Sequence, residues 1–81
     1  MIEFTGHADR KIKQRNLKKA LVKETLNKPD YVLPGYSNRE ISYKKIVKLY
    51  LAVVFVREED KIIVLTAYWD KSFKPKKKEA L

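Results

Sequence analysis

Cysteine is absent from this 81-residue sequence, and histidine occurs only once. The lack of cysteine excludes disulfides, thiolate nucleophiles and zinc sites built on thiolates. A single histidine also excludes metal sites built on several imidazoles. Glycine is scarce too, and the two glycines, Gly6 and Gly35, are too far apart for a glycine-rich phosphate loop. No pair of carboxylates falls on a predicted buried face, and no Ser-His nucleophile pattern is present.

Long hydrophobic runs are missing as well. The longest apolar run, from Leu49 to Val56, is far shorter than the ~20 residues that span a bilayer. The first residues do not resemble a signal peptide, because Glu3 and His7 interrupt them and no apolar core follows. We therefore expect no membrane segment and a cytoplasmic location.

Positive charge is what the sequence has in excess. Nineteen Lys and Arg residues face 10 Asp and Glu residues, for a formal net charge of +9. Without residues 71–81, which hold five lysines and one glutamate, 14 basic residues still face 9 acidic ones. Such a field attracts phosphate backbones of any sequence, so RNA or another polyanion is the expected partner. The alternative is a Lys-rich surface that serves only solubility.

Two short helices are predicted in the first third of the chain. Thr5 is a suitable N-cap for a helix over residues 7–15, because its hydroxyl can accept a bond from a free backbone N–H. Asn16 tolerates left-handed geometry and can end that helix. A second helix with a broader apolar face is predicted over residues 18–27. Pro29 ends it, since the residue before a proline avoids helical geometry.

The remaining elements are predicted strands. They cover residues 2–4, 31–33, 39–45, 49–57 and 61–69. The last two are apolar on both faces, which is typical of central strands. The polar segment Glu58-Glu59-Asp60 joins them as a hairpin, whereas the turn between Lys45 and Leu49 lacks Gly, Asn and Pro.

This order, β-α-α-β-β-β-β, predicts an α+β domain over residues 1–70. Two N-terminal helices are expected to pack on one face of a mostly antiparallel sheet of four to five strands. Residues 71–81 are rich in Lys and have no periodicity, so they are expected to form a basic, disordered tail.

The clearest functional pattern lies on the first predicted helix. His7, Lys11 and Arg15 follow one another at intervals of four residues, so they share one side of the helix. Like charges there repel by ~0.2–0.5 kcal/mol per pair, which an anionic ligand would offset. The imidazole could also act as a base or an acid near pH 7. The alternative is a solvated basic face, with His7 at the helix end or against the sheet.

Aromatic and basic side chains also interleave on the predicted strands. Arg39, Tyr43 and Lys45 share one face of the predicted strand over residues 39–45, and Ser42 and Lys44 share the other. Tyr68 lies on the last strand. Aromatic and cationic groups on an open sheet face can stack bases and pair with phosphates. The alternative is that the tyrosines are strand formers with wetted hydroxyls. The candidates for RNA binding are Tyr43, Lys44, Lys45 and Tyr50.

Three segments stand out by their order and spacing: Phe4-Thr5-Gly6-His7-Ala8 with Lys11, Arg15 and Leu17, then Pro29-Asp30-Tyr31-Val32, and Val64-Leu65-Thr66-Ala67-Tyr68-Trp69. Together they resemble domain-of-unknown-function family 4258, with its "HA-x-x-R-x-x-x-R-x-I" opening and its closing "V-x-T-x-Y" strand. The resemblance spans residues 4 to 70. Lys11 stands where Arg is commoner in that family, which weakens any role that needs a bidentate guanidinium, and Asn16 stands where a Gly usually ends the helix.

The resemblance implies kinship to the RelE/BrnT-like superfamily of small bacterial and archaeal toxins, and hence a RelE-like fold. These toxins are ribonucleases that a cognate antitoxin protein silences. The resemblance thus implies a metal-independent endoribonuclease without a cofactor, which acts on free or ribosome-bound RNA and binds an antitoxin. The sequence leaves open whether the chain forms a homodimer.

Cleavage of this kind needs a base for the ribose 2′-hydroxyl, cations for the phosphorane and an acid for the leaving 5′-oxygen. His7 would be the base or the acid, and Tyr68 or Tyr43 would be an acid or a stacking group. Two alternatives remain open: a non-catalytic RNA- or DNA-binding module and a domain that docks an antitoxin-like protein. The catalytic candidates are His7, Lys11, Arg15, Arg39 and Tyr68.

Overall fold

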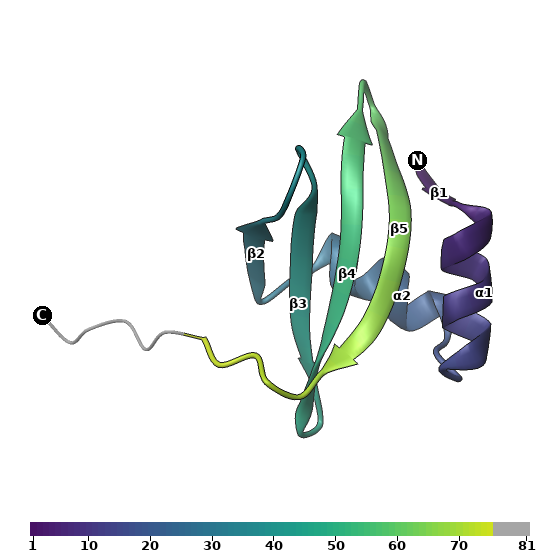
Figure 1. The fold of residues 1–81 in the computed structure, drawn as a ribbon. Helices are drawn as coiled ribbons and strands as arrows, with labels where there is room; N and C mark the ends of the chain where they lie inside the picture. The colour runs from purple at the N-terminus through teal and green to yellow at the C-terminus, as the bar shows by residue number, and fades with distance from the viewer. Residues whose placement is uncertain (76–81) are drawn as a thin grey trace, which may run out of the picture.

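The computed structural model describes residues 1–75 of the chain. It contains a five-stranded sheet and two helices, in the predicted element order (Figure 1). The predicted α+β class is therefore confirmed. The elements are β1 (Ile2–Phe4), α1 (Gly6–Gln14), α2 (Lys19–Asn27), β2 (Tyr31–Pro34), β3 (Glu40–Ile46), β4 (Leu49–Glu58) and β5 (Lys61–Asp70).

The sheet has the strand order β1-β5-β4-β3-β2. Only β1 and β5 pair in parallel, and all other neighbours are antiparallel. The two strands that are apolar on both faces, β4 and β5, each have a neighbour on either side, as predicted. A register shift between Val54 and Phe55 puts Val64 opposite Phe55 while Thr66 stays opposite Val54. This bulge leaves Leu65 as the extra residue, so Val64 and Ala67 both face the core.

Local signals place the helices where the sequence analysis predicts them. The Thr5 hydroxyl accepts a hydrogen bond from the backbone N–H of Ala8 at 3.0 Å, which caps α1. Asn16 follows that helix with a φ of 54°, the left-handed geometry expected of it. Helix α2 ends at Asn27, two residues before Pro29.

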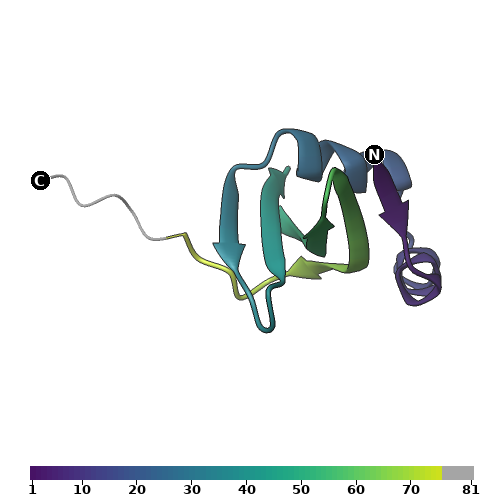
Figure 2. The same ribbon diagram turned by 90° about the horizontal axis from the view of Figure 1, so that it is seen from above.

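Both helices contribute to a single core. Helix α1 packs mainly on β5 and also on β1, and α2 packs on β4 and β3. Figure 2 shows α2 across one face of the sheet and α1 beside its β1–β5 end. The opposite face, which we call the open face, carries no helix. The buried core cluster consists of Ala8, Ile12, Leu17, Val22, Leu51, Val53, Val64 and Ala67.

The turn between β3 and β4 has an unusual backbone. Val47 adopts a φ of 60° and is 87% exposed. A β-branched residue rarely takes positive φ, because its side chain crowds the backbone there. This strained turn is the one for which the sequence carries no Gly, Asn or Pro.

The chain continues past β5 across the open face. In Figure 2 residues 71–75 lie on the side of the sheet away from α2. Phe73 packs onto aromatic side chains of the open face, as described below. The predicted disorder of residues 71–81 stays a prediction, since residues 76–81 lie outside the described part of the chain. Among the described helices, none has the length and apolar character needed to cross a bilayer.

Candidate functional site

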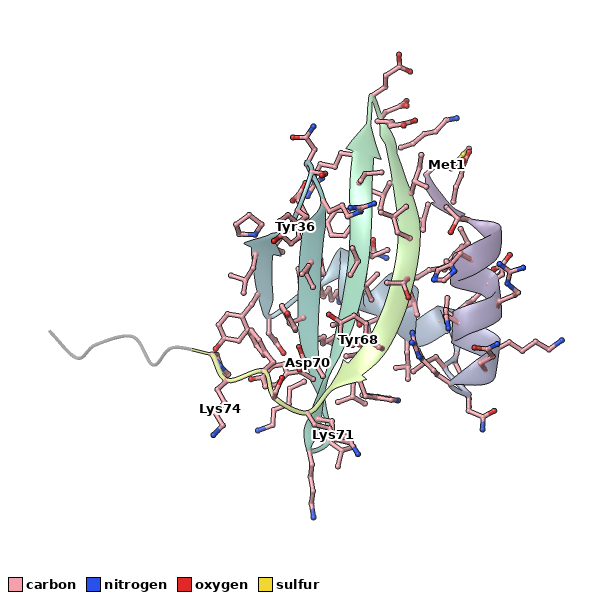
Figure 3. All side chains as sticks on the ribbon, in the orientation of Figure 1. Met1, Tyr36, Tyr68, Asp70, Lys71 and Lys74 are labelled. Carbon is pink, nitrogen blue, oxygen red and sulfur yellow. The ribbon has the colours of Figure 1, made fainter. Side chains whose placement is uncertain are left out.

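Two rows of side chains cross the lower part of the open face. Strand pairing through β4 puts Tyr43 of β3 and Tyr68 of β5 in one row. Lys45, Tyr50 and Asp70 form the next row. Their neighbours along the strands point into the core, so these side chains point away from it. Figure 3 shows Tyr68 and Asp70 near the lower end of β5.

Arg15 joins this site from the end of α1. Its Nη1 donates a hydrogen bond of 2.8 Å to the backbone carbonyl of Ala67 and one of 3.3 Å to the hydroxyl of Thr66. The carbonyl is available because β1 pairs with β5 only as far as Val64. The guanidinium thus takes the place of a missing strand beside Tyr68. Within residues 1–75 only Nη1 of Arg15 makes hydrogen bonds, so the other N–H groups of the guanidinium are free to bind an anion.

The phenols of Tyr43 and Tyr68 are held in their protonated form. Burial raises the pKa of Tyr68 above its usual value, and the Asp70 carboxylate raises it further, while Arg15 acts in the opposite direction. Burial also raises the pKa of Tyr43, with added contributions from Tyr68 and Asp70. At neutral pH both groups are therefore hydrogen-bond donors or acids, and neither is a base.

Lys11 and His7 lie about one and two turns before Arg15, respectively, on the same side of α1. His7 is exposed, and Lys11 is half-buried because its position borders the buried stripe of the helix. Asp9, on another side of α1, pairs with Lys19 at 2.9 Å. Since α1 packs along β5, the three predicted groups form one ridge next to the strand that carries Tyr68.

Two predicted site residues lie apart from the others. Arg39 is exposed in the turn before β3, and it precedes Tyr43 by four residues, which is about 13 Å along a strand. Lys44 points to the helix-covered face, where its Nζ donates a 3.1 Å hydrogen bond to the carbonyl of Lys28. That contact ties the end of α2 to the sheet. Lys45 does lie on the open face, exposed beside Tyr50.

Sequence reasoning missed a tight group of aromatic rings on the same face. Phe73 stacks on Tyr43 with ring centroids 3.7 Å apart and an interplanar angle of 7°. Its ring also meets Tyr31 and Tyr50 edge-on, at 5.8 Å and 5.0 Å. We call Tyr31, Tyr43 and Tyr50 the tyrosine cluster. Tyr43 and Tyr50 are among the predicted RNA-binding residues, but only the pairing of β2, β3 and β4 brings them together with Tyr31, so their grouping could not be predicted from a local pattern.

Asp70 was missed for a similar reason. It is the last residue of β5, and its place beside the tyrosines follows only from the pairing of β4 with β5, which puts it opposite Tyr50. Its Oδ1 accepts hydrogen bonds from the backbone N–H and the hydroxyl of Ser72, at 3.0 Å and 2.9 Å. These bonds fix the carboxylate next to the two phenols and begin the turn that brings Phe73 over the open face.

The described residues offer few other sites. A cavity of about 370 Å³ lies between β2 and the segment after β5, where it is lined by Tyr31, Leu33, Phe73, Lys74 and Pro75. Within residues 1–75 no three His, Asp or Glu side chains gather in a way that could hold a metal ion. The ridge on α1 and the open face next to it are therefore the strongest candidate site.

Comparison with known proteins gives one match. A protein-family model described as a domain of unknown function (DUF4258) matches residues 4–69. No curated protein and no solved structure matches the chain. The matched segment runs from the end of β1 almost to the end of β5 and contains the ridge, Tyr43 and Tyr68, while Asp70 and Phe73 fall just outside it.

Proposed function

The chain belongs to the domain-of-unknown-function family 4258, and we propose that it is a metal-independent ribonuclease of the toxin–antitoxin type. The observation that carries this proposal is the position of Arg15, which is anchored on the edge of β5 beside Tyr68. The same helix side presents His7 and Lys11. A base, two cations and a protonated phenol thus lie along one strand edge, with His7 about 12 Å from Arg15 along the helix axis, and an RNA strand that follows this edge could meet all of them. Kinship with RelE/BrnT-like toxins is part of the proposal.

The reaction would begin at the ribose 2′-hydroxyl. A neutral imidazole at His7 takes its proton, and the 2′-oxygen attacks the adjacent phosphorus. The bond from phosphorus to the 5′-oxygen of the next nucleotide then breaks, and a proton from the Tyr68 phenol neutralises that leaving oxygen. The products are a 2′,3′-cyclic phosphate and a 5′-hydroxyl end. The Tyr68 phenol carries its proton at pH 7, and Arg15 beside it lowers the pKa of the phenol against the upward effects of burial and Asp70, so the guanidinium favours transfer of that proton to the leaving oxygen.

Arg15 and Lys11 would stabilise the charge that builds up on phosphorus. The Arg15 Nη1 bonds hold the guanidinium plane in place before substrate binds, so little reorganisation is needed at the transition state. Lys11 adds a point charge one turn earlier on the helix. Arg39 lies before the start of β3 and Lys44 points to the helix-covered face, so we leave them out of the proposed mechanism.

Incubation of the purified protein with single-stranded RNA in excess EDTA tests the proposal. We expect fragments that end in 2′,3′-cyclic phosphate, and we expect His7→Ala and Tyr68→Phe to abolish them. Arg10→Ala is the matched control, because Arg10 is an exposed arginine of the same helix outside the ridge. Intact RNA, or cleavage that survives both substitutions, would contradict the proposal.

The second candidate function is RNA binding without cleavage. The tyrosine cluster and the exposed Lys45 beside it favour this alternative, because they form a stacking surface next to a cation. It predicts binding that weakens steeply with salt and leaves the strand intact. Binding that does not respond to salt would exclude it.

An antitoxin protein remains the proposed protein partner. Strand β2 pairs with β3 alone among the described strands, and all four of its residues are exposed. Such an apolar edge strand can accept a strand from another protein. Co-purification of the chain with the product of the neighbouring gene tests this, and a chain that purifies alone would argue against it.

A further inference from the structure

Phe73 makes an unusual aromatic contact with Tyr43. The two rings are nearly parallel at 7°, with centroids 3.7 Å apart, whereas aromatic pairs in proteins prefer offset or edge-to-face contacts. Face-to-face stacking at this separation is the arrangement that a nucleobase adopts on an aromatic side chain. The edges of Tyr31 and Tyr50 enclose the same ring. The tyrosine cluster therefore already holds one flat ring.

The segment that delivers Phe73 is weakly attached to the rest of the molecule. Residues 71–75 belong to no strand or helix. The hydrogen bonds in this segment are the local ones between Ser72 and Asp70. The Phe73 ring itself is only half-buried, and the cavity of about 370 Å³ borders it. Displacement of the ring would break no backbone pairing.

The charges around the tyrosine cluster favour an anionic ligand with a flat ring. Lys45 is exposed beside Tyr50, and Lys74 lines the cavity together with Tyr31 and Phe73. Two carboxylates adjoin the cluster, and both already accept hydrogen bonds: Asp30 from the backbone N–H of Lys45, and Asp70 from Ser72. The row that contains Tyr43 continues across the sheet to Tyr68, two strand spacings or about 10 Å away. A base held at Tyr43 would thus keep its strand of RNA on the surface that leads to Arg15.

We propose that the tyrosine cluster is a binding site for an unpaired nucleobase and that Phe73 occupies this site when RNA is absent. The C-terminal segment then acts as an internal competitor that RNA must displace. A base inside a duplex cannot enter the cluster, so the site selects single-stranded RNA. This inference rests on the proposed function and adds its substrate class and its regulation.

The test is binding of a fluorescent 2′-O-methyl RNA 12-mer, measured by anisotropy, since the methyl group blocks cleavage. We expect Phe73→Ala to tighten binding about 10-fold, because the competitor is gone. Phe73→Trp keeps a flat ring in the cluster and should bind no more tightly than the natural chain. Tyr36→Ala is the matched control, because Tyr36 is an aromatic residue that is 88% exposed and lies outside the cluster.

Tyr43→Leu removes the stacking surface but keeps an apolar side chain. We expect it to weaken binding about 10-fold and to cancel the gain when it is combined with Phe73→Ala. Thermal unfolding by circular dichroism checks that each variant is folded. A duplex of the same sequence should bind less tightly and should not respond to Phe73→Ala.

The possible outcomes separate the two proposals. If Phe73→Ala is folded but binds no more tightly than the natural chain, Phe73 is only a packing residue and this inference is wrong. Cleavage that depends on Arg15 would still support the ribonuclease in that case. If no variant binds or cleaves RNA, the proposed function fails, and the inference fails with it.

Discussion

Substitution of Arg15 by alanine probes both the fold and the proposed chemistry. The 2.8 Å bond from the guanidinium to the Ala67 carbonyl is charge-assisted, but Arg15 is exposed. We therefore expect its loss to cost only about 1 kcal/mol of the free energy of unfolding. For a domain of this size, that lowers the melting temperature by about 4–8 °C. The protein should remain folded at 25 °C.

The effect of Arg15→Ala on catalysis should be much larger. Removal of one preorganised donor to a transition-state anion costs about 10²–10³ in rate. We expect that loss in kcat/KM for RNA cleavage, measured under single-turnover conditions in EDTA. Arg15→Lys should recover only part of it, because one ammonium cannot bind Ala67 and also present a fork to phosphate.

Arg10→Ala again serves as the control, with the same change of charge on the same helix. If both alanine variants lose the same few-fold in rate, the effect comes from net charge and the proposed role of Arg15 is wrong. If Arg15→Ala loses activity only in proportion to its unfolded fraction, the residue acts through stability alone. Either result would contradict the proposal that Arg15, held at the edge of β5, stabilises the transition state.

Four further predictions concern stability and pH. Because burial raises the pKa of Tyr43, folding favours the protonated phenol, so the free energy of unfolding should fall as the pH rises above about 10; urea titrations should show a smaller fall for Tyr43→Phe. Asp70→Asn removes a carboxylate that raises the pKa of Tyr43, so the phenol should titrate at a lower pH, as followed by tyrosinate absorbance; an unchanged curve would contradict the contact. Val47→Asn should stabilise the protein by about 1 kcal/mol, because Asn tolerates the positive φ that strains valine; a lower melting temperature would disprove the strain. Leu51→Ala should cost about 2–5 kcal/mol, since Leu51 is fully buried in the core, and denaturation near that of the natural chain would be inconsistent with that core.

Predictions that depend on near neighbours in the sequence were accurate. The Thr5 cap bonds a residue three positions away, and Asn16 and Pro29 act on their own backbone geometry. The order of the elements followed from these local signals and from hydrophobic period. The exception is the turn at Val47, where tertiary pairing of β3 and β4 imposes a conformation that the residue itself disfavours.

The candidate site was predictable only in part. The ridge of His7, Lys11 and Arg15 follows from helical periodicity alone. The face of the sheet on which Lys44 lies follows from strand alternation, but its contact with Lys28 does not. The position of Arg39 just before β3 depends on where that strand begins. Both the contact of Lys44 and the start of β3 depend on the strand register, which is set by pairing between strands.

The sequence alone determined the element order, the basic charge and the grouping of His7, Lys11 and Arg15 on one side of a helix, because each depends on composition or on spacing within one element. Tertiary structure decided which strand edge the helix meets. It placed Arg15 on Ala67, 52 positions away, and Phe73 on Tyr43. The physical reason is that these contacts arise from sheet registers and a bulge, where the energy of the whole core selects the alignment and no short segment encodes it.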